Sequence, residues 1–236
     1  MALSSQILPE VSCQFVDLGL MDYSKAYAIQ QKKIQEVLST HVHQLLLCEH
    51  PPVFTLGRVS REDNFIFPRF EIEKSGVPVI AVDRGGEITF HGPGQLVIYP
   101  IFELKSLGGD LKLFMHMLED VAMDALKVFG ITANRIPGQR GIFVHKDKIG
   151  SIGIGIKKWV SFHGMSLNVN TDLRYSQMIR PCGLDVAMTS MQHILGKTID
   201  MALVKAEIIR SFEREFHLNI DQGGNEHGLS GTSGIG

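Results

Sequence analysis

One stretch of the chain, residues 84–100, limits the possible folds more than any other part of the sequence. Its first half combines four glycines with two side chains that suit a ligand: Arg84, Gly85, Gly86, His91, Gly92 and Gly94. Residues that favour strands lie on both sides of Gly92 and Gly94, so the stretch predicts a strand, a tight loop and a second strand. Glycine lets the backbone adopt positive φ and lets a ligand contact main-chain N–H groups. Two interpretations stay open, a hairpin without a ligand and a binding loop.

The composition excludes several classes of protein. The 236 residues are 20% charged and 44% hydrophobic with a net charge of −2, which argues against a generally basic nucleic-acid binder. No apolar segment approaches the roughly 20 residues that span a bilayer, so we expect no membrane segment. The first ten residues have neither a basic region nor an apolar run, and three scattered cysteines do not make a disulfide framework. We therefore expect reduced thiols and a cytoplasmic location.

Alternating strand-like and helix-like segments predict a single α/β domain over residues 1–220, followed by a disordered glycine- and serine-rich tail over residues 221–236. We expect strands over residues 14–18, 43–48, 53–58, 77–82, 142–145, 148–156 and 159–170, with residues 77–82 buried and a turn at residues 146–147. Helices are predicted over residues 23–38, 111–129, around 189–195 and over 201–216, capped at Asp22 or Ser24, at Asp110 and at Asp200. Residues 61–76 are predicted to form a surface excursion with room for a short helix.

The predicted strand over residues 148–156 is unusual because glycines interrupt it. Alternation places Ile152, Ile154 and Ile156 on one face, while Gly153 and Gly155 leave the other face without side chains. Glycine weakens a strand, so something is expected to pack directly on this backbone. Two occupants fit equally well, a long thin apolar ligand and another segment of the protein.

Cys182 and Lys148 are the candidates for covalent and acid–base chemistry. Cys182 lies in a predicted loop with Arg180 two residues away, and a nearby cation favours the reactive thiolate. Lys148 opens the glycine-rich strand, where burial would desolvate its amine. The alternatives are a loop thiol without a role and a strand-end lysine that reaches water. His91 and His163 suit either acid–base chemistry or the fixing of loop conformation.

Three histidines near one predicted strand, His41, His43 and His50, raise the question of a metal site. They lack carboxylate or thiol partners at ligand spacing. We therefore predict no metal.

Five segments of the chain resemble the lipoyl(octanoyl) transferase family. They are residues 49–58 (Glu-His-Pro-Pro-Val-Phe-Thr-Leu-Gly-Arg), 84–95, 148–153, 162–169 and 181–184 (Pro-Cys-Gly-Leu). The segments occur in the family's order and spacing, and the resemblance covers about residues 14–215. It implies an α/β (α+β) fold of mixed sheets flanked by helices, as in lipoate–protein and biotin–protein ligases. The chain carries Glu87 and Phe90 where the family more often has a polar amide and a tyrosine.

The resemblance also implies roles for individual residues. Cys182 would be the acyl-thioester nucleophile, and Lys148 would favour its thiolate. The substrate-binding segments would comprise Arg84, Gly85, Gly86, Glu87, Ile88, Thr89, Phe90, His91, Ser151, Ile152, Gly153, Gly164, Met165 and Ser166.

The activity that the resemblance implies is an acyltransferase reaction of protein lipoylation. The donor would be octanoyl-acyl carrier protein, and the acceptors would be lysines of lipoyl domains in 2-oxoacid dehydrogenase complexes and in the glycine cleavage H protein. Conversion of a thioester to an amide runs downhill, so we expect no ATP and no other cofactor. We expect a monomer that binds neither nucleic acid nor membranes.

Two other functions stay open at this point. One is an ATP-dependent lipoate–protein ligase of the same fold, and the other is a non-catalytic module that binds acyl chains. Lys157, Lys158 and Arg174 would suit docking of an acidic protein partner, although an ordinary solvated face explains them equally well.

Overall fold

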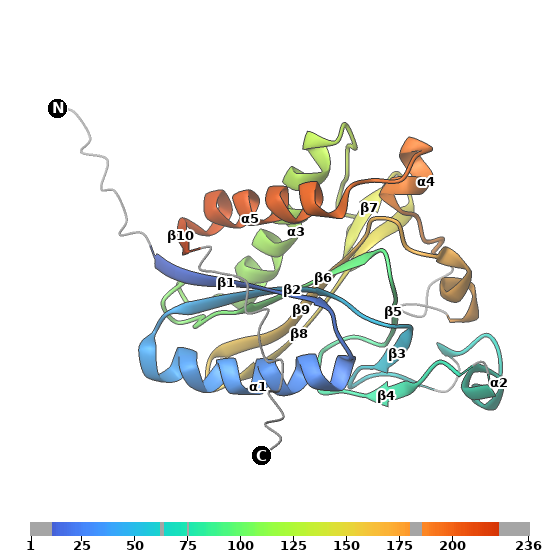
Figure 1. Cartoon of the computed structure of the whole chain (residues 1–236), viewed down its shortest axis with the longest axis horizontal. Coiled ribbons are helices and arrows are strands. Elements are labelled where there is room, and N and C mark those ends of the chain that lie inside the picture. Colours follow the sequence, from blue (N-terminus) through green and yellow to red (C-terminus); the bar gives the residue numbers. More distant parts are fainter. Residues whose placement is uncertain (1–10, 62–63, 75, 180–185, 222–236) are drawn as a thin grey trace, which may run out of the picture.

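The computed structural model describes residues 11–61, 64–74, 76–179 and 186–221, which form two mixed β-sheets flanked by helices (Figure 1). The larger sheet consists, in spatial order, of β10 (Leu218–Asp221), β1 (Val11–Leu20), β2 (His43–Glu49), β6 (Gln95–Ile101), β9 (Val160–Asn168), β8 (Asp147–Lys157) and β7 (Ile142–Val144). The smaller sheet contains β4 (Val79–Ala81), β3 (Val53–Leu56) and β5 (Ile88–His91) in that order. The predicted fold class is confirmed.

Helices cover both faces of the larger sheet (Figure 1). The helix α1 (Tyr23–Thr40) lies on one face, while α3 (Leu111–Val128) and α5 (Met201–Phe216) pack together on the other. Alternate residues of the central strands divide between the two cores: Leu96 and Ile98 of β6 join the cluster under α3 and α5, whereas Val97 and Tyr99 join the cluster under α1. The short elements are α2 (Arg69–Lys74), a 3₁₀ helix η2 (Leu173–Met178) and α4 (Met191–Leu195). None of the helices in the described residues combines the length and apolar character that a bilayer crossing requires.

The three long helices begin at the predicted aspartates. The Asp22 side chain accepts hydrogen bonds from the N–H groups of Ser24 and Lys25, and Asp110 and Asp200 cap α3 and α5 in the same way. An N-cap carboxylate satisfies donors that have no partner inside the helix, which fixes where each helix starts. The predicted helix starts are therefore confirmed.

Residues 88–101 form the predicted strand, tight loop and strand, but the two strands do not pair with each other. β5 pairs antiparallel with β3 in the smaller sheet, whereas β6 runs between β2 and β9 in the larger sheet. The hairpin interpretation is therefore wrong. The glycine turn connects the smaller sheet to the larger one. Gly94 adopts φ +80° in this turn, and a Cβ at this position would lie only 2.5 Å from Asn170 O.

Three further predictions need correction. The strand predicted over residues 77–82 is not buried: β4 covers only Val79–Ala81, and Ala81 is exposed because β4 is the outer strand of its sheet. The hairpin turn precedes Asp147, which already belongs to β8, and His145 adopts φ +56° in that turn. The sequence analysis missed β10, a four-residue strand directly after α5 that pairs in parallel with β1. The predicted tail over residues 221–236 lies outside the described residues except for Asp221.

The bare face of the glycine-rich strand β8 is covered by protein. A Cβ at Gly153 would lie 2.8 Å from Gly85 O and 3.1 Å from Arg84 Cδ, and the Gly85 N–H donates to Ile154 O over 2.9 Å. A Cβ at Gly155 would lie 2.4 Å from the ring of Phe162. The sequence left open whether an apolar ligand or another protein segment packs on this face of β8. In the structure, another segment of the chain packs there.

Gly164 of β9 provides a test of this close packing. A Cβ there would lie 2.1 Å from Ile98 O and 2.6 Å from Pro100 Cδ, so Gly164→Ala must displace β6. We expect a loss in the free energy of unfolding at the upper end of the about 1–3 kcal/mol typical of overpacking, measured by urea denaturation. Gly85→Ala is the control, because its nearest neighbour would be Ile154 O at an ordinary 3.5 Å. Equal stability of the two variants would contradict the predicted clash.

Candidate active site

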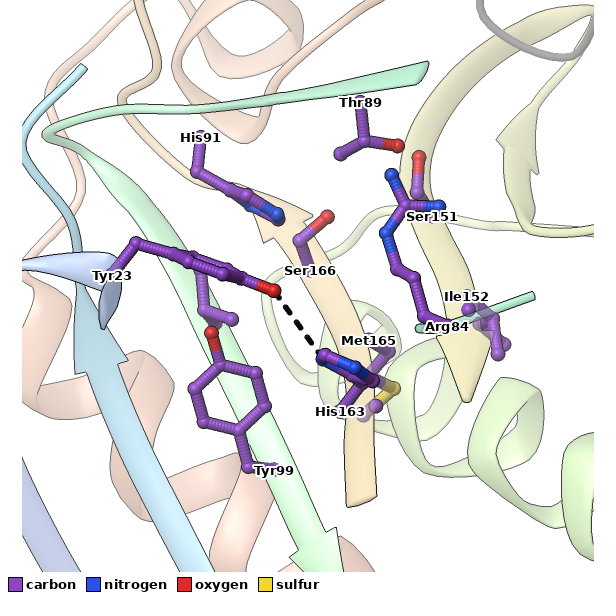
Figure 2. Close-up of a pocket in the computed structure, with 13 residues that line it drawn as sticks. Tyr23, Arg84, Thr89, His91, Tyr99, Ser151, Ile152, His163, Met165 and Ser166 are labelled. Carbon is purple, nitrogen blue, oxygen red and sulfur yellow. Dashed lines mark hydrogen bonds between the residues drawn. The ribbon is translucent and has the colours of Figure 1, made fainter. Parts of the chain in front are cut away.

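A narrow pocket lies where the two sheets meet (Figure 2). Its described lining comes from the start of α1, from residues 84–91, and from β6, β8 and β9: Tyr23, Arg84, Thr89, His91, Val97, Tyr99, Ser151, Ile152, Gly153, His163, Gly164, Met165 and Ser166. Its free volume is about 30 Å³, well below the range for small-molecule pockets, so it suits only a slender ligand.

Nine of the predicted substrate-binding residues line this pocket: Arg84, Thr89, His91, Ser151, Ile152, Gly153, Gly164, Met165 and Ser166. Five others lie elsewhere. The Glu87 carboxylate accepts from Asn64 Nδ2 over 2.9 Å, and Ile88 and Phe90 pack in the core of the smaller sheet. Gly85 packs against β8, and Gly86 packs against residues 57–59, which follow β3. The structure thus brings the three predicted segments together, and their role in substrate binding stays a prediction.

The pocket has a hydroxyl end, where Thr89 and Ser151 lie (Figure 2), and Ser151 is the register partner of Ser166 across β8 and β9. Figure 2 places Tyr23 and Tyr99 on the side away from Ser151. Because β8 begins at Asp147, the hydroxyl end is also the end nearer to Lys148. A ligand with one polar end and an apolar chain fits this arrangement.

A hydrogen-bonded chain of side chains closes the pocket beside α1. His163 Nε2 lies 2.8 Å from Asp83 Oδ1, and a carboxylate only accepts, so Nε2 carries the proton. Nδ1 then accepts from the Tyr23 hydroxyl, 3.3 Å away (Figure 2). Burial lowers the pKa of His163 to about 4 against the opposing effect of Asp83, so the ring is neutral. His163 has φ +55°, an uncommon conformation for a residue with a Cβ.

His91 is held by side chains of β6 and β9. Gln95 Nε2 donates to Phe90 O and to Asn168 Oδ1, which orients its amide so that Oε1 accepts from His91 Nδ1 over 2.7 Å. Burial lowers the pKa of His91 to about 3, and the neighbouring His50 adds to the shift. The neutral ring therefore fixes the loop, which is one of the two roles that the sequence left open.

Arg84 is the one cation in the described pocket lining. Its guanidinium donates to Thr55 O, to Thr55 Oγ1 and to Gly85 O, so it connects the 84–86 loop to β3. Its side chain is 7% exposed. These contacts give Arg84 a structural role in building the wall.

Lys148 is buried at the start of β8, and its backbone N–H and C=O groups both form hydrogen bonds with residues 187–189. Its N–H donates to Ala187 O over 2.8 Å, and its carbonyl accepts from Thr189 N over 2.9 Å. Its Nζ lies 5.8 Å from the centre of the Phe143 ring. The position therefore differs from that of a strand-end lysine that reaches water.

Cys182 lies outside the described residues, but residues on both sides of residues 180–185 share one small cavity. Ile179 and Met188 line it together with Thr89 and Ser151, two residues that also line the main pocket. The two described cysteines, Cys13 and Cys48, are buried in strands, and burial raises the pKa of both thiols far above the ordinary value. Neither suits nucleophilic chemistry.

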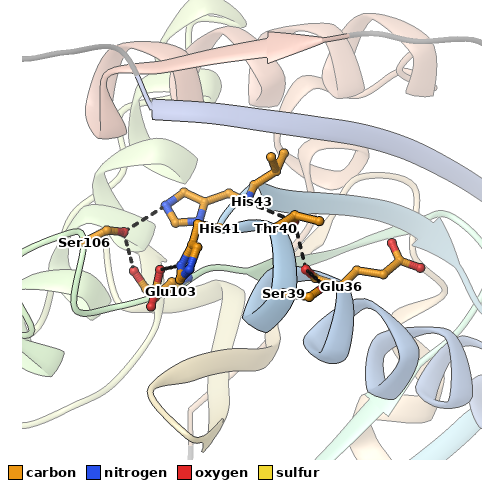
Figure 3. Close-up of polar contacts among 8 residues, drawn as sticks. Glu36, Ser39, Thr40, His41, His43, Glu103 and Ser106 are labelled. Atoms are coloured by element: carbon orange, nitrogen blue, oxygen red, sulfur yellow. Dashed lines mark hydrogen bonds and ion pairs between the residues drawn. The ribbon is translucent and has the colours of Figure 1, made fainter.

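The histidines that raised the question of a metal make local contacts. Figure 3 shows His41 Nδ1 paired with Glu103 Oε2 at 2.9 Å, and His43 Nε2 near Ser106 Oγ. His50 donates from Nδ1 to Met21 O over 2.6 Å and accepts from the Tyr99 hydroxyl over 2.7 Å. Within the described ranges, no three His, Cys, Asp or Glu side chains gather as a metal site would require.

The sequence analysis missed three residues of the pocket, Tyr23, Val97 and Tyr99. Tyr23 falls in a predicted helix and Val97 and Tyr99 in a predicted strand, and the latter two do pack in the core under α1. Their location in the pocket depends on the two sheets meeting beside the first turn of α1, which no local pattern encodes.

Comparison with known proteins identifies the family. Residues 22–213 match the family described as the lipoyl protein ligase A/B catalytic domain. The octanoyltransferase of Syntrophotalea carbinolica is 39% identical over 199 residues, covering 84% of this chain and 91% of its own.

Two solved structures share the fold. The bipartite lipoate protein ligase of Thermoplasma acidophilum superposes with a TM-score of 0.66 at 12% identity, covering 90% of this chain and 86% of its own. The Aquifex aeolicus biotin protein ligase in complex with biotin and ATP gives a TM-score of 0.54 at 12% identity, over 87% and 70% of the two chains. The family match and the sequence identity together make this chain a member of the octanoyltransferases, acyltransferases built on the lipoyl protein ligase A/B catalytic domain.

Proposed function

We propose that the enzyme moves an octanoyl group from octanoyl-acyl carrier protein to a lysine of a lipoyl domain, through a thioester on Cys182. The acceptors would be the lipoyl domains of 2-oxoacid dehydrogenase complexes and the glycine cleavage H protein. We further propose that residues 1–220 form one catalytic domain and that the enzyme acts as a cytoplasmic monomer.

The observation that carries the proposal is the small cavity near Lys148 that is lined by residues on both sides of positions 180–185. Ile179 and Met188 flank positions 180–185 in sequence, and both line this small cavity, which shares the lining residues Thr89 and Ser151 with the main pocket. The bonds from Lys148 to Ala187 and Thr189 bind the later flank to the start of β8. These contacts support a reaction at the hydroxyl end of the pocket.

In the first step, the Cys182 thiolate attacks the carbonyl carbon of the octanoyl thioester. The new bond joins the acyl carbon to the cysteine sulfur, and the bond to the carrier sulfur breaks. The Lys148 ammonium, which stabilises the thiolate beforehand, gives its proton to the departing carrier thiolate. The products are the acyl-enzyme, free carrier thiol and a neutral Lys148.

In the second step, the amine of the acceptor lysine attacks the acyl-enzyme. The carbon–nitrogen bond forms, the bond to the Cys182 sulfur breaks, and the amine proton passes to neutral Lys148. The thiolate and the ammonium are thereby restored. Because an amide is more stable than a thioester, the cycle needs no ATP.

The eight-carbon chain would lie in the pocket while this chemistry proceeds at the hydroxyl end. Ile152, Met165, Val97 and the ring of Tyr99 supply apolar wall, and the histidines in the lining are neutral. An apolar chain gains free energy from burial against such groups. The docking role of Lys157, Lys158 and Arg174 stays a prediction; Arg174 is ion-paired with Asp172.

The thiol step has a direct test. After mixing with octanoyl-acyl carrier protein, the intact mass should increase by one octanoyl group, and hydroxylamine should remove it because thioesters are labile to this reagent. Cys182→Ser should lose the hydroxylamine-labile adduct. Cys13→Ala is the matched control, because Cys13 is buried in β1 and should leave the adduct intact. A labile adduct that persists in Cys182→Ser would refute the proposed nucleophile.

The role of Lys148 is tested by separating the two steps. Lys148→Ala should slow both acylation and transfer by about 10²–10⁴-fold, the usual contribution of general acid–base catalysis. Lys148→Arg keeps the positive charge that stabilises the Cys182 thiolate but cannot become the neutral base of the second step, so acylation should recover more than transfer. Rapid-quench mass spectrometry measures each step. Lys146→Ala, at the exposed turn before β8, is the control, and unchanged rates in Lys148→Ala would remove Lys148 from the mechanism.

The ATP-dependent ligase reaction is the competing function, and it predicts an adenylate. Incubation with octanoic or lipoic acid and labelled ATP should yield no acyl-adenylate, while transfer from octanoyl-acyl carrier protein should proceed without ATP. Thin-layer chromatography of the labelled nucleotide provides the measurement. An ATP-dependent transfer of the free acid would instead assign the ligase reaction to this enzyme.

A further inference from the structure

A single layer of side chains separates the pocket from an open groove behind it. Tyr23 lines both spaces. The groove has a free volume of about 430 Å³ between α1 and the edge of the smaller sheet, and its described lining is Tyr23, Ser24, Tyr27, Ile80, Ala81, Val82 and Asp83. His163 of the pocket lining bonds directly to Asp83 of the groove lining. Tyr23 and His163 therefore form the partition.

Contacts on several sides hold Tyr23 in this partition. Its ring stacks on His91 at 6.0 Å and meets His50 edge-on at 5.3 Å. Its hydroxyl bonds to His163, and the side chain is only 4% exposed. A side chain held in this way acts as a rigid wall.

The wall stands on the side of the pocket away from Ser151 (Figure 2). Figure 2 shows the Tyr23 ring across the pocket from Ser151, and Ser151 lies on the same strand as Lys148. An acyl chain whose carbonyl lies near Lys148 would therefore point its methyl end toward Tyr23. Beyond Tyr23, the groove continues over the apolar residues Ile80, Ala81 and Val82.

We propose that Tyr23 is a specificity-determining residue, which limits the length of the acyl chain by closing the pocket against the groove. This inference rests on the proposed function, since it assumes an acyl chain bound with its carbonyl near Lys148. When the ring is removed, pocket and groove join, and the groove receives the additional carbons of a longer chain.

The test is a competition between octanoyl- and dodecanoyl-acyl carrier protein for transfer to a lipoyl domain, read by the mass of the product. Tyr23→Ala should raise the ratio of dodecanoyl to octanoyl product about 10-fold or more, the discrimination expected when a pocket stops excluding extra methylene groups. An unchanged ratio would overturn the proposal. Tyr23→Leu, a smaller change in volume, should shift the ratio in the same direction if Tyr23→Ala does not fold.

Three variants test whether a change in chain-length preference is due to loss of the Tyr23 ring from the wall. Tyr23→Phe keeps the ring and should keep the octanoyl preference. Ile80→Ala shortens a side chain that lines the groove but not the pocket, and it should leave the ratio unchanged. Ala81→Trp fills the groove; it should leave the wild-type ratio unchanged and cancel the gain in Tyr23→Ala. An Ala81→Trp double variant that still prefers the longer chain would place that chain outside the groove and refute the proposal.

A binding measurement distinguishes failure of this inference from failure of the proposed function. Titration calorimetry with octanoic and dodecanoic acids on Cys182→Ser, with and without Tyr23→Ala, needs neither the thiol nor a carrier. Tighter dodecanoic acid binding in the Tyr23→Ala protein supports the wall even if no transfer activity is found. Wild-type transfer combined with unchanged binding preference in Tyr23→Ala would overturn the wall and leave the proposed function intact.

Discussion

The contact between the 84–86 loop and strand β8 is the interaction on which the site depends. Gly85 N–H donates to Ile154 O, and the backbone approaches closely because Gly153 has no side chain. Arg84 extends from the same loop to Thr55 of the smaller sheet. One short segment thus ties both sheets together, and the pocket is the space left on its inner side. Any side chain at Gly153 would push the sheets apart.

Local sequence signals predicted the elements well and their spatial relations less well. Aspartate caps and the apolar periodicity of residues 111–129 located the long helices because both signals are local. β10 and the edge position of β4 were missed because four residues carry little periodicity and because burial of a strand depends on its neighbours. The glycine turn at residues 92–94 was recognised as a turn, but sequence does not say whether two strands joined by a turn pair with each other.

Some residues of the candidate site could likewise be predicted from the sequence, and others depended on the three-dimensional arrangement. The family resemblance selected three segments that the structure brings into one pocket, because ordered motifs reflect a shared fold. Tyr23 lies in a helix and Tyr99 in a strand whose sequence patterns are those of ordinary core elements. The pattern alone therefore did not indicate that both residues line the pocket. The neutral state of His91 and His163 likewise follows from burial and partners that only the three-dimensional structure reveals.

The backbone of His163 has a consequence for how this enzyme can evolve. A residue with a Cβ at φ +55° costs about 1 kcal/mol or more relative to a relaxed conformation, and a glycine at this position would avoid that cost. A glycine would also remove the imidazole that joins Asp83 to Tyr23. Thermal stability and a closed pocket would therefore favour different residues at the same position.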